Sequence, residues 1–186
     1  ETNLVGPLTP YGKTKLMIEQ VITDIPSLNS IILRYFNPIG CNKTLKESPL
    51  STPENLAPFI IKVLLKEIPE LTIFGNDYNT PDGTCIRDFI HIDDLIDGHI
   101  AALDYILKGD QIKEVFNLGT GTGYSVLEMI KEFERQGYPV PFKIGPKRNG
   151  DIETVCANPE KANKILNWKA KNGLTEMVKN LIETSF

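Results

Sequence analysis

Tyr11 and Lys15 lie four residues apart in the segment Tyr-Gly-Lys-Thr-Lys. Residues at positions i and i+4 share one face of a helix, so the phenol and the ammonium can meet. A neighbouring cation favours the phenolate form, and a phenolate near neutral pH is a usable general base. The pair therefore predicts a proton-transfer site. A tyrosine and a lysine on the surface of an amphipathic helix would have the same spacing, and that alternative stays open.

Two arginines that are far apart in the sequence are candidates for binding an oxyanion. Arg87 begins the run Arg-Asp-Phe-Ile-His, and Arg148 begins Arg-Asn-Gly-Asp, which ends at Asp151. A planar guanidinium binds phosphate through parallel hydrogen bonds, so two arginines at one pocket would suit a diphosphate. For each arginine taken alone, a surface salt bridge is the favoured explanation, because the spacing does not show that the two converge. His91 lies in an apolar alternation and is expected to be a packed histidine rather than a catalytic one.

Two further segments follow predicted strands. Asn37 comes directly after the apolar run 30–36, and ligands of open α/β sheets bind at the carboxyl ends of strands. An asparagine that bonds its own backbone in a turn is the alternative. Residues 119–123 (Gly-Thr-Gly-Thr-Gly) lie between a predicted strand and a helix, where phosphate-binding turns occur. Because Tyr124 replaces the last glycine of the dinucleotide motif, we expect a tight turn there, and contact with a ligand is the alternative.

Strands and helices alternate along the sequence, which predicts an α/β fold. Helices are expected from Pro10 with Thr9 as the cap, after Thr52-Pro53, after Asp93 as the cap, at 126–135 after a Ser125–Glu128 capping box, near 159–166 and near 174–182. Strands are expected at 30–36, 71–74, 87–92, 115–118 and 140–144, with 37–40 as a turn and 41–51 as a loop.

The composition limits the classes of function. With 20 Lys and Arg against 24 Asp and Glu, the net charge of −4 offers no basic surface for nucleic acid or a membrane. No run of 18 apolar residues occurs, so no membrane span is expected. Three cysteines without a C-x-x-C pair favour a reducing, cytoplasmic location and argue against a metal site. The chain starts at Glu1 without an initiator methionine, so we expect a portion of a longer protein.

Taken together and in order, the motifs resemble the UDP-glucose 4-epimerases of the extended short-chain dehydrogenase/reductase family. They are Tyr11-x-x-x-Lys15, Leu-Arg-Tyr-Phe-Asn-Pro-x-Gly, Asn55-Leu56-x-Pro, Ile-Phe-Gly-Asn-Asp-Tyr, Asp-Gly-Thr, Arg-Asp-Phe-Ile-His, Asn-Leu-Gly-x-Gly and Arg-x-Gly-Asp. The resemblance covers nearly the whole chain and corresponds to the C-terminal part of that family. It implies late strands of a Rossmann-like parallel sheet in 1–40 and 84–120, and a smaller substrate-binding lobe in 41–83 and 121–186.

The resemblance also implies an activity. It is C4 epimerisation between UDP-glucose and UDP-galactose through a transient 4-keto sugar, with NAD as the cofactor. Tyr11 would take the proton of the sugar 4-hydroxyl, and Lys15 would hold the nicotinamide ribose. Tyr35 and Phe36 would lie at the cofactor. The residues implied for the UDP-sugar are Asn37, Asn55, Leu56, Thr72, Phe74, Arg87, Arg148, Asp151 and Val155.

Some features depart from the family pattern. The glycine-rich dinucleotide turn and the Ser or Thr that shares the sugar hydroxyl would lie before Glu1, so this chain alone is expected to be inactive. Phe89 stands where a tyrosine is usual, and the 41–51 segment is shorter than in the family. Val155 is small at a position where some members carry tyrosine, which implies room for an N-acetyl sugar.

Other functions stay open. The chain would also suit another UDP-sugar epimerase, dehydratase or decarboxylase of the same fold. A catalytically silent nucleotide-sugar binding module is the alternative outside the enzymes. The family commonly forms homodimers, and this implicates the exposed side of the 10–24 helix.

Overall fold

The computed structural model describes residues 1, 6–7, 9–41 and 55–186. Its helices are α1 (Pro10–Thr23), α2 (Leu56–Leu64), α3 (Ile92–Ile106), α4 (Val126–Arg135), α5 (Glu160–Ile165) and α6 (Leu174–Ser185). Its strands are β1 (Ser30–Tyr35), β2 (Asn37–Ile39), β3 (Leu71–Phe74), β4 (Ile86–His91), β5 (Lys113–Leu118), β6 (Gly123–Ser125), β7 (Phe142–Gly145) and β8 (Thr154–Val155). The predicted α/β class is confirmed. The helix start expected at Thr52-Pro53 lies outside the described residues, as does most of the 41–51 loop.

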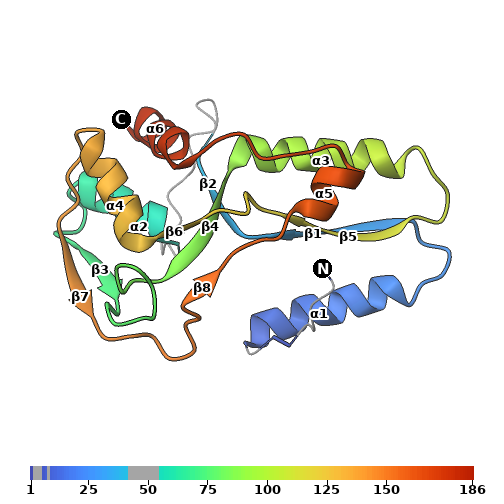
Figure 1. The fold of residues 1–186 in the computed structure, drawn as a ribbon, viewed down its shortest axis with the longest axis horizontal. Helices are drawn as coiled ribbons and strands as arrows, with labels where there is room; N and C mark the ends of the chain where they lie inside the picture. Colours follow the sequence, from blue (N-terminus) through green and yellow to red (C-terminus); the bar gives the residue numbers. More distant parts are fainter. Residues whose placement is uncertain (2–5, 8, 42–54) are drawn as a thin grey trace.

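Most strand pairs are parallel. β1 pairs with β5, from Ser30 opposite Lys113 to Tyr35 opposite Leu118. β4 pairs in parallel with β2 and with β8, and antiparallel with β6, while β3 pairs in parallel with β7. β4 is therefore the strand that connects the elements along the middle of the molecule, as Figure 1 shows.

Residues 37–40 do not form the predicted turn directly after β1. Asn37 to Ile39 make the short strand β2, in which Asn37 lies opposite Phe89 of β4. The pairing buries Ile39 and gives the backbone groups partners, which a turn would leave exposed. Gly40 follows β2 with a φ of +106°, which suits a residue without a side chain.

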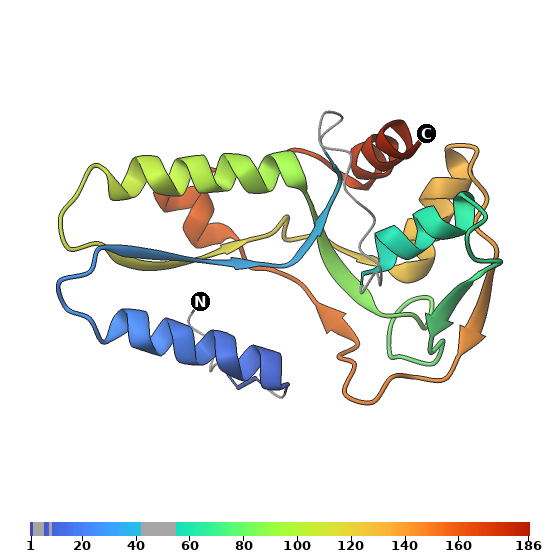
Figure 2. The same cartoon turned by 180° about the vertical axis from the view of Figure 1, so that it is seen from behind.

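The helices flank the β1–β5 pair on two sides. Figures 1 and 2 show α1 on one side of these strands and α3 with α5 on the other. No side chain of α1 is buried. Polar contacts hold it instead. Arg34 of β1 donates to the Glu19 carboxylate at 2.8 and 2.6 Å, and Lys113 of β5 donates to the carbonyl oxygen of Thr23 at 2.7 Å.

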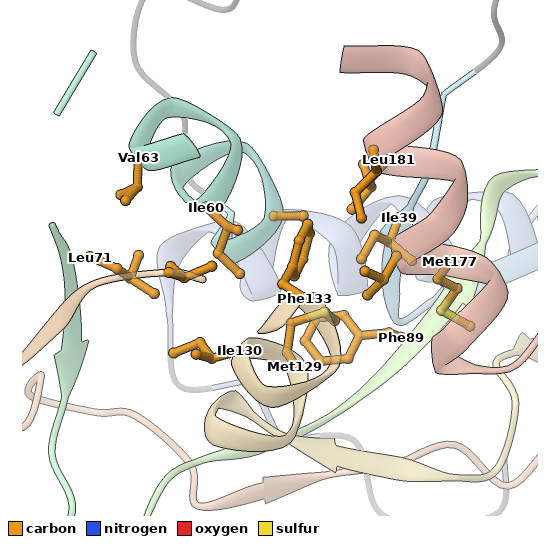
Figure 3. Close-up of a cluster of buried hydrophobic side chains, with 14 of the residues drawn as sticks. Ile39, Ile60, Val63, Leu71, Phe89, Met129, Ile130, Phe133, Met177 and Leu181 are labelled. Carbon is orange, nitrogen blue, oxygen red and sulfur yellow. The ribbon is translucent and has the colours of Figure 1, made fainter. Parts of the chain in front are cut away.

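Two apolar clusters share the interior. The first cluster is formed mainly by α2, β3, α4 and α6, and Figure 3 shows side chains of these elements meeting around Phe133. The second lies between α3, β5 and α5 and includes Phe116, Leu118, Ala162, Leu166 and Trp168. Ala162, Leu166 and Trp168 come from the 121–186 part of the expected substrate-binding lobe and pack here against Phe116 and Leu118 of β5. The division into a sheet part and a lobe stays a prediction.

The helix caps are partly as predicted. Thr9 accepts a hydrogen bond from the Gly12 N–H, and Ser125 and Glu128 form the expected capping box of α4. The cap of α3 was assigned wrongly. It is His91, whose Nδ1 accepts from the Asp93 N–H at 3.1 Å, so α3 begins at Ile92 and Asp93 lies in its first turn. The buried position of His91 confirms the prediction of a packed histidine.

No helix among the described residues is both long and apolar enough to cross a membrane.

Candidate functional site

The phenol of Tyr11 and the ammonium of Lys15 meet at the start of α1. The Lys15 Nζ lies 5.3 Å from the centre of the Tyr11 ring, because Thr9 and Pro10 start the helix where the sequence predicts and place both residues on one face. The Tyr11 side chain is 71 % exposed, and within the described residues its hydroxyl makes no hydrogen bond. The described part of the chain therefore brings the pair together but does not enclose it.

The end of α1 that carries this pair faces the rest of the candidate site. In both Figure 1 and Figure 2, the N-terminal end of α1 lies on the side of the molecule nearest β8. β8 contains Val155, which is opposite Arg87 of β4. No direct contact joins Tyr11 or Lys15 to Arg87 or Arg148 among the described residues, so the expectation that these groups face one cleft stays a prediction.

The residues predicted to bind a nucleotide lie together at β3, β4 and the loop after β7. The Arg87 Nη2 lies 4.0 Å from the Asp151 Oδ1. The guanidinium carbon of Arg148 lies 3.8 Å from the centre of the Phe74 ring, a stacking distance. One short loop, 148–151, thus contacts two strands, and the structure brings together both arginines, the aspartate and the aromatic ring.

Strand alternation explains how Thr72 and Phe74 are positioned. Leu71 and Ile73 are buried in the first cluster, so Thr72 and Phe74 point to the opposite face of β3. Phe74 lies opposite Gly145 of β7 in the parallel register. A Cβ on Gly145 would come within 2.8 Å of the Thr72 Cγ2, so the missing side chain leaves room for Thr72.

Asn37, Asn55 and Leu56 lie at other elements. Asn37 is in β2, beside β4, and Asn55 is the residue before α2. The Asn55 side chain makes no capping hydrogen bond, so its amide is not used by the helix. Leu56 is the first residue of α2 and packs against the first cluster. Among the described residues, no hydrogen bond joins either asparagine to the arginine loop.

Tyr35 and Phe36 have different surroundings. Arg34 contacts α1, and the next residue of the strand points the opposite way, so the Tyr35 hydroxyl lies 2.5 Å from His99 Nε2 on α3. His99 Nδ1 is 2.7 Å from the Leu95 carbonyl oxygen, which makes Nε2 the acceptor of the tyrosine hydroxyl. Tyr35 is therefore not grouped with Tyr11 and Lys15. Phe36 lies beside Gly119, where a Cβ would approach its ring to 3.2 Å.

The glycine-rich turn at 119–123 is closed by a residue that the sequence analysis missed. Asp88 is fully buried, and its carboxylate accepts from the N–H and Oγ1 of Thr120 at 2.9 and 2.7 Å, from the Gly121 N–H at 2.9 Å and from the Ala157 N–H at 3.1 Å. Such a concave set of N–H donors is typical of an anion site. The chain's own carboxylate fills it, so the turn is structural, as expected. The feature of the sequence that could have indicated this role is a charged residue, Asp88, inside a predicted strand.

The Asp88 carboxylate also affects its neighbour Cys156. Burial raises the pKa of the Cys156 thiol, and the negative charge of Asp88 acts in the same direction. The thiol sulfur lies 3.8 Å from the Asp88 Oδ2. This thiol is therefore held in its neutral, less nucleophilic form.

One groove on the described surface lies away from these residues, and they include no candidate metal cluster. A groove of about 390 Å³ lies between the end of α2 and the turn after α4, and none of the predicted site residues lines it. Within the described residues, no group of three or more His, Cys, Asp or Glu side chains could hold a metal ion. The candidate site is an open surface built around Phe74, Arg87, Arg148 and Asp151.

Comparison with known proteins identifies related chains. UDP-glucose 4-epimerase 2 of Arabidopsis thaliana is 48 % identical over 191 residues, which cover 97 % of this chain and 54 % of that protein. UDP-glucose 4-epimerase of Bacillus subtilis is 46 % identical over 180 residues, covering 93 % and 53 %. The chain thus spans about half the length of the curated relatives it matches.

Two solved structures similar to this chain are also UDP-glucose 4-epimerases, and the chain again covers just over half of each. A UDP-glucose 4-epimerase from Stenotrophomonas maltophila with bound NAD and formylated UDP-arabinopyranose has a TM-score of 0.93 and 41 % identity, covering 100 % of this chain and 57 % of that one. The enzyme from Bifidobacterium longum in complex with NAD+ and UDP has a TM-score of 0.89 and 42 % identity, covering 99 % and 56 %.

The family model gives the assignment. Residues 1–119, which include the Tyr11–Lys15 pair and the strand with Arg87, match the model described as the NAD dependent epimerase/dehydratase family. The observed α/β elements and parallel pairings agree with a partial Rossmann-like fold of this kind. The chain therefore belongs to the NAD dependent epimerase/dehydratase family.

Proposed function

We propose that this chain forms the UDP-sugar-binding part of an enzyme that interconverts UDP-glucose and UDP-galactose at C4 of the sugar. The observation that carries the proposal is the stacking of Arg148 on Phe74 beside the Arg87–Asp151 contact. Two guanidinium groups and an exposed aromatic edge suit a diphosphate attached to a base. A relative with this half of the fold was crystallised with NAD+ and UDP.

Different side chains would contact different parts of the UDP-sugar. Phe74 and Thr72, on one face of β3, would flank the uracil, and Arg87 with Arg148 would neutralise the diphosphate. Asp151 is a hydrogen-bond acceptor for a ribose hydroxyl. The amides of Asn37 and Asn55 and the Leu56 backbone, with Val155 beside Arg87, would contact the sugar.

Tyr11 is the proposed general base for the sugar 4-hydroxyl, with the Lys15 cation 5.3 Å from its ring. Bound NAD would accept the hydride from the sugar C4 and return it. The residues present fit such a cofactor, because neither the Tyr11 hydroxyl nor the Lys15 ammonium is engaged in a hydrogen bond within the described residues. Lys15 would hold the nicotinamide ribose, and Phe36, directly after β1, would lie near the cofactor. The Tyr35 hydroxyl lies at His99 on α3, so Tyr35 is not proposed to contact it.

A titration of the chain with UDP and with uridine tests the nucleotide site. Arg148→Met should weaken UDP by about tenfold or more and leave uridine unchanged, since a hydrogen bond to a charged group contributes about 1.5–3 kcal/mol. Arg135→Met is the matched control, because Arg135 is an exposed arginine paired with Glu132 on α4. Equal UDP affinity of the Arg148 variant and the wild type would overturn the assignment, as would a wild-type chain that binds no UDP.

The role of Tyr11 is tested in the full enzyme that contains this chain. Tyr11→Phe removes the general base, so we predict a fall in kcat of about 10²–10⁴-fold with an unchanged Kd for UDP. Steady-state kinetics combined with UDP titration separates the two effects. Near-normal kcat in the variant would remove Tyr11 from this role.

The choice of sugar is a second part of the proposal. Val155 is a small side chain in β8, opposite Arg87. A small residue at this position would leave room for an N-acetyl group. A relative from Campylobacter jejuni, 35 % identical, is described as a UDP-Glc/GlcNAc 4-epimerase. We expect the full enzyme to turn over UDP-N-acetylglucosamine as well. Turnover of UDP-glucose without any of the N-acetyl sugar would contradict this.

The assembly and location of the full enzyme are further parts of the proposal. α1 exposes Met17, Ile18 and Val21, an apolar surface that would suit a homodimer contact. The three cysteines form no disulfide, in keeping with the expected reducing, cytoplasmic location.

A further inference from the structure

The loop that carries Arg148 and Asp151 has few backbone restraints. Residues 146–151 are exposed, and within this loop one backbone hydrogen bond is formed, from the Asp151 N–H to the Arg148 carbonyl oxygen at 3.3 Å. Loops with so few backbone hydrogen bonds open at little cost in free energy. The positions of Arg148 and Asp151 must therefore depend on side-chain contacts.

Lys147 makes three contacts, all with the segment that follows β3. Its Nζ lies 3.1 Å from the Asp77 Oδ1 and donates to the Asp77 carbonyl oxygen at 3.0 Å. The same ammonium lies 4.3 Å from the centre of the Tyr78 ring, within the range of a cation–π contact. Lys147, the residue directly before Arg148, therefore attaches the loop to residues 77–78.

Gly75 makes room for this attachment. A Cβ at Gly75 would come within 2.6 Å of the Lys147 Cγ and 2.7 Å of the Tyr78 Cε2. The φ of Gly75 is +85°, a conformation that residues with side chains rarely adopt. The stem of Lys147 and the ring of Tyr78 both pack on the space that the missing side chain leaves.

The attachment adjoins the nucleotide-binding groups. Phe74, on which Arg148 stacks, directly precedes Gly75. The charges of Asp151 and Arg87 both influence the Tyr78 hydroxyl, so the ring under Lys147 lies within the range of their charges. Lys147 thus contacts the segment that directly follows Phe74, and the next residue along the chain, Arg148, stacks on Phe74.

We propose that Lys147 is a positioning residue, which attaches the 146–151 loop to residues 75–78 and so holds Arg148 over Phe74 for a nucleoside diphosphate. The ligand class rests on the proposed function, whereas the attachment itself does not. The rival role is direct attraction of the diphosphate by the Lys147 charge. The two roles can be distinguished, because positioning requires the contact of the ammonium with Asp77, whereas direct attraction requires only its charge.

A measurement without ligand tests the attachment. A guanidinium stacked on an aromatic ring experiences a ring-current shift, so the Arg148 side-chain protons should resonate upfield in the NMR spectrum of the wild-type chain. Lys147→Met keeps the length of the side chain and removes the charge, and we expect most of this shift to disappear. The Phe74→Leu variant gives the chemical shift of the Arg148 side-chain protons in the absence of the aromatic ring. An unchanged Arg148 shift in the Lys147 variant would overturn the proposal.

Lys143→Met is the matched control for the loss of a charge. Lys143 lies on the neighbouring strand β7 and forms an exposed ion pair with Glu70 at 2.8 Å, so it has the same charge but no contact with the 75–78 segment in the described structure. We expect the Arg148 shift and UDP affinity of this variant to match the wild type. A loss equal to that of Lys147→Met would show an effect of net charge and overturn the positioning role.

UDP titration then separates positioning from direct attraction. Lys147→Met should weaken UDP about five- to tenfold and leave uridine unchanged. Asp77→Asn keeps the Lys147 charge and its contacts with the Asp77 carbonyl oxygen and the Tyr78 ring but removes the ion pair. It should weaken UDP about two- to fivefold, the range of one exposed ion pair. Full UDP affinity in the Asp77 variant, together with a loss of UDP affinity and an unchanged Arg148 shift in Lys147→Met, would show that Lys147 acts by its own charge. If the wild-type chain binds no UDP, the proposed function fails, and the NMR comparison still decides the role of Lys147.

Discussion

The hydroxyl of Tyr78 is buried, although the residue lies in a surface segment. It makes no hydrogen bond within the described structure. Burial raises the pKa of Tyr78 to about 12, with the Cys85 thiol and the Asp151 carboxylate acting in the same direction and Arg87 opposing them. The ring therefore stays neutral over the physiological pH range and remains a favourable surface for the Lys147 cation.

The pH dependence of stability should show this burial. Because the folded chain keeps the Tyr78 proton up to about pH 12 and the unfolded chain releases it near 10, its contribution to stability is complete below pH 10 and is lost as the pH rises to 12. Tyr78→Phe should remove this part of the alkaline loss. Urea unfolding of both chains across this range measures the difference. If the free energy of unfolding fell equally with pH in both chains, the prediction would be contradicted.

At the scale of elements, α1 is held by charge rather than by apolar packing. None of its side chains is buried, while Arg34 and Lys113 reach it from two strands. The hydrogen bonds from Arg34 hold the pKa of Glu19 below its usual value, against the opposing effect of burial. The helix that carries Tyr11 and Lys15 therefore depends on a carboxylate that must stay ionised.

Glu19→Gln should loosen α1 without unfolding the rest of the chain. A lowered pKa means that the Glu19 contribution is complete above pH 4.5 and is lost as the pH falls through the lower folded value. At neutral pH we expect faster amide hydrogen exchange across α1 in the variant, with α6 unchanged. Glu160→Gln, which removes an exposed pair with Lys164 on α5, should leave α1 unaffected. Equal exchange in α1 of all three chains would argue against this role.

At the scale of the whole molecule, β4 connects the two apolar clusters. Phe89 packs in the first cluster and Ile90 in the second, because neighbouring residues of a strand face opposite sides. Trp168, the one tryptophan of the sequence, lies in the second cluster and donates its Nε1–H to the Asp94 carbonyl oxygen. A shared strand implies that the clusters unfold together.

Phe133→Ala tests this coupling. Phe133 is fully buried in the first cluster, so its truncation should cost about 3–5 kcal/mol. We expect the urea midpoint from Trp168 fluorescence to fall together with the midpoint from circular dichroism, although Trp168 belongs to the other cluster. Phe142→Ala, at a 43 % exposed position of β7, should shift both much less. A Trp168 midpoint that does not move would show that the clusters unfold independently.

Local signals in the sequence determined most of the helices and several strands. Thr9-Pro10 and the Ser125–Glu128 box mark helix starts through hydrogen bonds that span three residues, so no remote partner is needed. The same holds for Tyr11 and Lys15, whose contact depends only on helical spacing. The strand at 71–74 was predictable because its alternation reflects one buried face.

Only the tertiary structure decided the features that depend on remote partners. Asn37 joins a strand because β4 supplies its pairing, and Tyr35 turns toward α3 because Arg34 is engaged by α1. The burial of the Asp88 carboxylate depends on N–H groups 32 to 69 residues away. Motif order along the sequence indicated the family. Which side chains meet is set by long-range packing and backbone pairing, since neither is encoded in local spacing.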